Sequence, residues 1–198
     1  MTAAWNCNKI SKVVEPVLKY NGDAIYYINI SQDSYKLGGS SFNQVLNTIG
    51  NETPDVKSSH FLKNIFNTIQ NLIKEDKISA GHDVASGGFI TTLLEMCFED
   101  NNLGANIDLT SLSESDSIKL LFSENTGIIF QADASIEKTL LDESIEFFTI
   151  GKVIDKGTVT IKNYEDNFIF DVSKVRDTWF MTSYLLDQKQ TSNGLAEH

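Results

Sequence analysis

The sequence has few cysteines, few basic residues and no long apolar run. Its two cysteines, Cys7 and Cys97, form neither a CxxC pair nor a cysteine–histidine spacing typical of zinc sites. Both thiols are therefore expected to be free, partly buried and in a reducing compartment. No apolar run approaches the roughly 18 residues of a membrane span, and the N-terminus lacks the features of a signal peptide. These absences predict a cytoplasmic chain without a disulfide framework.

Positive charge is also scarce. The 198 residues include 27 acidic and 16 basic side chains, which give a net charge of −11. An acidic surface repels nucleic acid and anionic membranes, so neither is an expected partner. The sequence matches neither the P-loop nor the dinucleotide fingerprint, and it shows no Ser/His/Asp or Cys/His order typical of a nucleophile.

What is present is the pattern of one domain, a mixed β-sheet with helices packed on it. The expected strands are 1–5, 23–31, 77–84, 104–109, 126–132, 147–154, 157–162 and 167–172. The expected helices are 40–49, 60–74, 89–98, 113–122, 136–141 and 173–188. The domain is expected to span residues 1–190, with a polar tail or linker at 191–198. Both ends read as cut, so the chain is expected to be a fragment of a longer protein.

The stretch "GHDVASGGF" joins an expected strand to an expected helix. A glycine turn at a helix start exposes backbone N–H groups and a partial positive charge, which can hold a phosphate. The nucleotide candidates are His82, Ser86, Gly87 and Gly88, and Asp83 offers the hard oxygen that Mg²⁺ accepts. The alternative is structural: Ser86 caps the helix, Asp83 bonds the turn and His82 packs beside the sheet.

Two further polar stretches raise the same alternatives. "LGGSSF" precedes an expected short helix and is either a second phosphate turn or a turn with Ser40 or Ser41 as the helix cap. "FSENTG" lies between a helix and a strand, and its Ser123, Glu124 and Asn125 are expected to be exposed loop residues.

Four stretches in order resemble the C-terminal-type domain, the second half, of the second synthetase repeat in the phosphoribosylformylglycinamidine synthase family, in its long single-chain form. They are "LGGSSFNQVLNTIGNETPDV", "GHDVASGGFITTLLEMCFEDNNLGANIDL", "LLFSENTGIIFQA" and "VRDTWFMTSYLLDQKQ". The start, "TAAWNCNKISKVVEPVLK", is similar to the first strand of that domain and the extended segment after it. The resemblance covers nearly the whole chain. It implies a mixed sheet flanked by helices, like the C-terminal domain of aminoimidazole ribonucleotide synthetase.

The resemblance also implies a function. The whole enzyme uses ATP and ammonia from glutamine to convert formylglycinamide ribonucleotide to its amidine in purine biosynthesis. Asp83 matches the family's Mg²⁺-binding aspartate at an ATP or ADP site between domains. Ala85 stands where the family commonly has a nucleotide-contacting serine, while Ser123 and Glu124 match a loop that touches substrate in the first repeat.

The remaining machinery lies outside this sequence, in the N-terminal-type synthetase domains and the glutaminase domain. The isolated chain is therefore expected to be inactive and to self-associate through the surface that those domains cover. Two alternatives stay open: another enzyme of the same superfamily, and a stand-alone binding or scaffold domain without catalysis.

Overall fold

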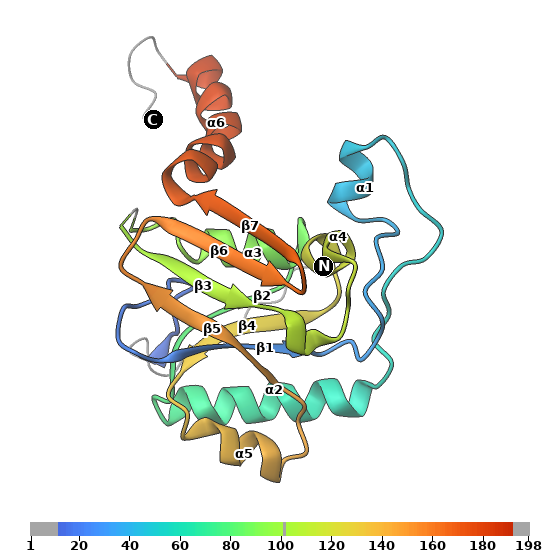
Figure 1. Cartoon of the computed structure of the whole chain (residues 1–198), viewed down its shortest axis with the longest axis vertical. Helices are drawn as coiled ribbons and strands as arrows, with labels where there is room; N and C mark the ends of the chain where they lie inside the picture. Colours follow the sequence, from blue (N-terminus) through green and yellow to red (C-terminus); the bar gives the residue numbers. More distant parts are fainter. Residues whose placement is uncertain (1–11, 101, 192–198) are drawn as a thin grey trace.

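The computed structural model describes residues 12–100 and 102–191 (Figure 1). The strands are β1 (Ala24–Asn29), β2 (Ile78–Asp83), β3 (Gly104–Asp108), β4 (Gly127–Ala132), β5 (Phe148–Ile154), β6 (Thr158–Asn163) and β7 (Asp166–Asp171). The helices are α1 (Ser41–Val45), α2 (Ser59–Lys74), α3 (Gly88–Glu95), α4 (Ser117–Phe122), α5 (Ile136–Asp142) and α6 (Val172–Gln190), with a 3₁₀ turn at Thr110–Leu112.

The seven strands form one mixed sheet in the order β2-β4-β1-β5-β3-β6-β7. All neighbouring strands are antiparallel except β3 and β6. The last two strands form the hairpin expected from their spacing, with Thr158 opposite Asp171 and Asn163 opposite Asp166. The expected fold class, a mixed sheet flanked by helices, is confirmed.

Helices cover the two faces of the sheet unequally. Alternate residues of β1 enter different cores: Ile25 and Tyr27 pack on the side of α3 and α4, and Tyr26 and Ile28 on the side of α2 and α5. This two-sided burial explains the nearly continuous apolar run of that strand. Over the other half of the sheet, β5, β3, β6 and β7, the second face is open, and exposed residues such as Asn106 and Lys162 alternate with buried ones.

Helix α2 shows how sequence dictates local structure. Its apolar residues recur on one face, and Ile65, Ile69 and Leu72 are buried against the sheet. Ser58 caps the helix, because its side chain accepts a hydrogen bond from the Phe61 N–H at 3.1 Å. Helix α6 differs: it extends away from the body of the domain, and Val172 is its buried residue (Figure 1).

Most expected elements are confirmed within a few residues. One helix start is wrong: α4 begins after Asp116, whose carboxylate accepts from the N–H groups of Ile118 and Lys119. Ser113 instead follows the 3₁₀ turn with φ 57°. The short helix after Ser40 also ends at Val45 rather than at Ile49. The expected strand at 1–5 lies outside the described residues.

No helix in the described part of the chain is long and apolar enough to cross a membrane. Cys97 is a free, buried thiol, as expected, and burial raises its pKa to about 12. Cys7 lies outside the described residues.

Leu93 on α3 tests the core, because it is fully buried between that helix and the sheet. Leu93→Ala should lower the free energy of unfolding by about 2–5 kcal/mol, since it removes buried methyl groups and leaves a cavity. Leu141→Ala on α5, where the side chain is exposed, should change it by less than about 0.5 kcal/mol. Urea unfolding measures both, and equal losses would contradict this assignment of the core.

Candidate functional site

Strand β2 carries the first candidate residues to the edge of the sheet. Asp83 ends the strand, and its side chain is 83% exposed. His82 is half-buried: its Nδ1 lies 2.8 Å from the Asp83 carbonyl oxygen, and its Nε2 lies 3.6 Å from Oε2 of Glu95 on α3. His82 thus packs beside the sheet, as the structural alternative required. The Asp83 carboxylate lies 3.4 Å from the His82 ring and faces solvent, so it is free to meet a ligand.

The two glycines after Asp83 are required by backbone geometry. Gly87 and Gly88 have φ angles of 88° and 76°, in the left-handed region that favours glycine. A Cβ on Gly87 would lie 2.3 Å from Oγ1 of Thr91, and one on Gly88 would lie 2.7 Å from the Phe122 carbonyl carbon. Gly88 therefore lets α3 pack closely against the end of α4.

Ser86 does not cap α3. The N-cap position is Gly87, which makes no side-chain cap bond, and Ser86 is exposed. That part of the structural alternative is wrong, because the chain turns through the left-handed glycine one residue later than a serine cap requires.

Glu124 joins the three polar stretches. One carboxylate oxygen, Oε1, accepts hydrogen bonds from the backbone N–H groups of Ser41 and Gly87, both at 2.8 Å. These donors belong to the first turn of α1 and to the turn that starts α3. An internal carboxylate therefore occupies one backbone N–H group in each of "LGGSSF" and "HDVASGG" that a phosphate could otherwise use.

The charge of Glu124 is stabilised in this position. Burial alone would raise the pKa of the carboxyl group, but the N–H groups of Ser41 and Gly87 and the Ser41 hydroxyl outweigh it and lower the pKa. Glu124 is thus held ionised, as an anion between two helix starts.

The expectation that 123–125 is an exposed loop is wrong. Ser123 is 2% exposed, and Asn125 is buried as well. The Asn125 side chain donates to Ser31 Oγ at 3.0 Å and to the Ser34 carbonyl at 3.1 Å, and so fixes the loop after β1. A buried polar side chain needs such partners, and this loop supplies them from residues distant in sequence.

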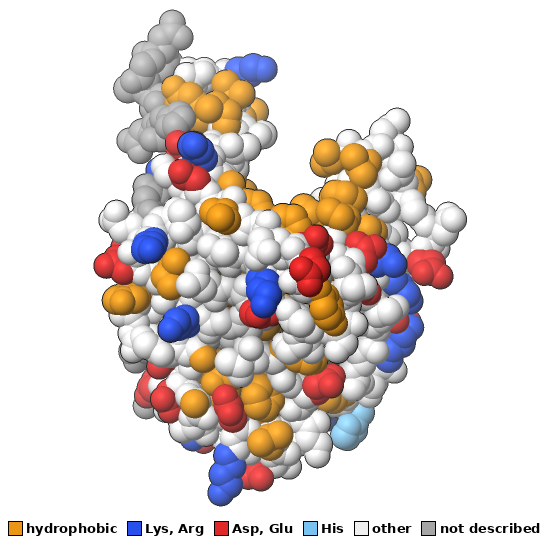
Figure 2. Space-filling view, in the orientation of Figure 1, with side chains coloured by type: hydrophobic (Ala, Val, Ile, Leu, Met, Phe, Trp, Pro, Cys, Tyr) orange, Lys and Arg blue, Asp and Glu red, His pale blue; other side chains and the backbone are white. Residues whose placement is uncertain are grey.

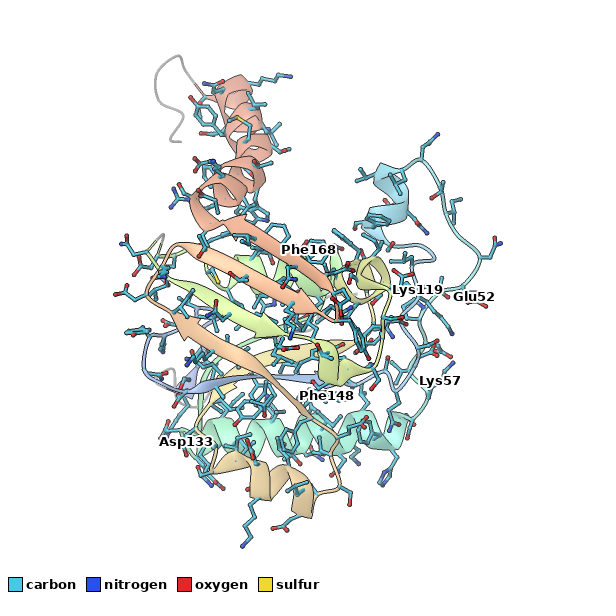
Figure 3. The ribbon with its side chains drawn as sticks, viewed as in Figure 1. Glu52, Lys57, Lys119, Asp133, Phe148 and Phe168 are labelled. Atoms are coloured by element: carbon cyan, nitrogen blue, oxygen red, sulfur yellow. The ribbon has the colours of Figure 1, made fainter. Side chains whose placement is uncertain are left out.

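Asp33 anchors the same loop from its other side. Its side chain is largely buried, and its Oδ2 lies 2.8 Å from Nζ of Lys36 and 3.2 Å from Nζ of Lys57. The Lys36 hydrogen bond, which outweighs the effect of burial, lowers the pKa of Asp33 strongly, with further help from Lys57. Lys57 lies on the segment that returns from α1 (Figure 3).

A cavity of about 810 Å³ lies between α2 and the β2 edge of the sheet. Leu62 and Phe66 of α2, together with Ile30, line it with apolar side chains, and His82 and Asp83 also line it. A concave apolar groove beside a few polar groups is the usual form of a small-molecule site.

The described residues can supply one protein ligand to a metal ion, but they do not form a complete metal site. No group of three or more His, Cys, Asp or Glu side chains gathers around a common point in the part of the chain that the structure describes. Mg²⁺ commonly takes one or two protein carboxylates and completes its shell with phosphate oxygens and water. The exposed Asp83 carboxylate suits such a shared site.

Comparison with known families agrees with this fold. A model described as "AIR synthase related protein, C-terminal domain" matches residues 21–162. The chain belongs to this family. The resemblance read from the sequence is thereby confirmed for most of the chain.

Relatives with curated names share the resemblance. The chain is 36% identical over 201 residues to the probable phosphoribosylformylglycinamidine synthase, chloroplastic/mitochondrial, of Arabidopsis thaliana, and 34% identical over 218 residues to the phosphoribosylformylglycinamidine synthase of Dictyostelium discoideum. Each match covers 96% of this chain but 14% and 16% of the respective relative. The chain therefore spans a small part of the length of these relatives.

A solved structure has the same fold. It is described as T. maritima PurL complexed with ATP, and it matches 84% of this chain and 28% of its own with a TM-score of 0.62. The sequence identity is 14%, so this likeness supports the fold alone.

Sequence reasoning missed three contributors to the site. Asp33 and Asn125 were not recognised as anchors, and Glu95 was not among the candidate residues. Glu95 accepts a hydrogen bond from the indole N–H of Trp179 at 2.9 Å and also faces His82. Its position at the end of α3 gave no signal of these long-range contacts.

Replacing Glu124 tests the internal anion. Because charged hydrogen bonds are stronger than neutral ones, Glu124→Gln should lower the free energy of unfolding by about 1–2 kcal/mol at neutral pH. The folded-state pKa is below the unfolded value, so this stabilisation is complete above about pH 4.3 and is lost as pH falls through the folded pKa. Urea unfolding at a series of pH values measures the difference.

The matched control is Glu99→Gln, which removes an exposed carboxylate from the turn after α3. It should leave the stability nearly unchanged across the same pH range. A Glu124→Gln protein as stable as the wild type at pH 7 would show that the two backbone N–H groups do not need the charge.

Proposed function

We propose that this chain acts as one domain of a phosphoribosylformylglycinamidine synthase, the ATP-dependent amidotransferase of purine biosynthesis. The observation that carries the proposal is the family match over residues 21–162, together with curated relatives of that name that align to 96% of the chain. The relatives are several times longer, which supports the fragment interpretation and the need for further domains.

The proposed contribution of the chain is one wall of a nucleotide site between domains. Asp83 would hold Mg²⁺ at the exposed end of β2, and a bound Mg²⁺ would neutralise phosphate charge there. His82 lines the groove beside it. Ser86 is exposed at the same turn and is the remaining hydroxyl for a nucleotide contact, because Ala85 has none.

The backbone groups of the turn have a supporting role in this proposal. The Gly87 N–H is bonded to Glu124, and the Gly88 N–H donates to the Ala85 carbonyl at 3.0 Å. Gly87 and Gly88 would therefore position the turn, and Glu124 would fix it, while a direct phosphate contact at Gly87 would require Glu124 to leave. Ser123 is buried, so Glu124 is the member of that loop that reaches the site.

A second candidate function is a binding or scaffold domain without catalysis. The observation that favours it is that an internal carboxylate already accepts from one backbone N–H group in each of the two glycine turns. The two functions differ in one respect: the ligase domain needs the Asp83 carboxylate, and the scaffold does not.

The test is Asp83→Asn in the complete synthetase polypeptide, with amidine formation measured against Mg²⁺ concentration at saturating ATP. Loss of a carboxylate ligand should weaken the Mg²⁺ response by at least about tenfold, the lower limit seen when partners of metal ligands are removed. The 198-residue chain, assayed alone, should show no turnover.

Asp142→Asn is the control, because Asp142 is an exposed carboxylate on α5, away from the groove. It should keep the wild-type Mg²⁺ response. A wild-type response from Asp83→Asn would exclude this residue as a ligand, and an inactive wild-type polypeptide would overturn the ligase function.

A further inference from the structure

Two segments project from the domain on either side of a hollow (Figure 2). One is α1 with the residues that follow it to Ile49, and the other is α6 from Thr178 to Leu186. We call these two segments the arms. Figure 2 shows apolar side chains on both arms where they face the hollow, and Figure 3 places Phe168 of β7 at its base.

The arms expose large apolar side chains. On the first arm, Val45 is 86% exposed and Ile49 is 78% exposed. On the second, Trp179 is 51% exposed, and Leu185 and Leu186 are exposed to a similar degree. Single exposed apolar residues are common on protein surfaces, but a group that rims one hollow marks an interaction site.

The arms also lack charge. Residues 37–51 and 178–186 contain no Asp, Glu, Lys or Arg, in a chain whose net charge is −11 and in which 22% of residues are charged. Charged residues flank both segments, at Lys36 and Glu52 and at Asp177 and Asp187. Depletion of charge with enrichment of aromatic and methionine side chains is the composition of a protein–protein interface core.

The second arm has little support from its own domain. Val172, at the start of α6, is the buried residue of this 19-residue helix. Beyond it, Trp179 packs on Phe98 with ring centroids 5.6 Å apart, and its indole N–H reaches Glu95. Helices gain most of their stability from packing an apolar face, and the apolar face of α6 beyond Trp179 is exposed.

We propose that the two arms form one docking surface for a neighbouring folded domain of the same longer polypeptide. The partner would present an uncharged apolar element, such as a helix face, to the hollow. A neighbouring domain is favoured over a second copy because this chain aligns to only 14–16% of the length of the matched relatives, which leaves most of their length for other domains. This inference rests on the proposed function, which places the chain inside such a polypeptide.

The test compares amide hydrogen exchange in the complete synthetase polypeptide and in the 198-residue chain, at a concentration where light scattering shows a monomer. Amides of α1 and of the second half of α6 should exchange at least about tenfold more slowly in the complete polypeptide, because docking adds to the free energy of opening. Amides of α5, on the opposite side of the domain, should exchange equally in both.

Variants of the complete polypeptide sharpen the test. Val45→Glu on one arm and Leu185→Glu on the other should each speed exchange on both arms, because a buried charge displaces the shared partner. Leu141→Glu on α5 is the matched control, since that side chain is exposed on another surface, and it should leave exchange of the arms unchanged.

Three outcomes would overturn the proposal. Equal exchange of the arms in both proteins would mean that no domain covers them. If the arms of the 198-residue chain exchange more slowly as its concentration rises, the surface binds a second copy. If a substitution speeds exchange only on its own arm, the two arms do not share one partner. Amidine formation is measured on the same preparation and tests the proposed function separately. An active enzyme whose arms exchange fast would support the proposed function and contradict the docking proposal.

Discussion

The carboxylate of Glu124 accepts hydrogen bonds from two backbone N–H groups, on Ser41 and on Gly87, that lie far apart in the sequence. This contact holds the α1 segment, the start of α3 and the loop before β4 in one arrangement. The Gly87 turn directly follows the strand that presents Asp83, so the position of the candidate metal ligand depends on the same carboxylate. Because the three segments supply the groups of the site, the site exists only when these segments have come together.

Neighbouring contacts follow the same physical rule, that a buried polar group must find partners. Asn125 satisfies its side chain with the loop after β1, and Asp33 pairs with Lys36 and Lys57. These bonds attach the long segment between β1 and α2, which includes α1, to the body of the domain. The stacked rings of Phe42 and Phe122, with centroids 4.7 Å apart, add an apolar contact between the α1 segment and α4. The first arm is therefore attached at its base, while its tip is exposed.

The sequence predicted the elements well, because their signals are local. The apolar periodicity of α2, the β-rich run of β1 and the hairpin spacing of β6 and β7 all report on neighbours in the chain. The start of α4 was missed because Ser113 and Asp116 both resemble caps in the sequence, whereas in the structure Asp116 makes the cap bonds and Ser113 has a left-handed backbone. The burial of Asn125 could not be predicted, since its partners come from a loop about ninety residues earlier. The two-glycine turn was recognised as special, and the structure adds that close packing against α4 requires Gly88.

The site and the arms support the proposal that this domain works together with other domains. Asp83 offers one ligand beside an apolar groove, and the arms offer an uncharged surface with large exposed apolar side chains. The family match and the length of the relatives give the same picture. The most direct measurement is a denaturing gel of the source cells, probed with an antibody against this chain. A band several-fold heavier than 22.1 kDa is the predicted result, and a band near 22.1 kDa would contradict the account.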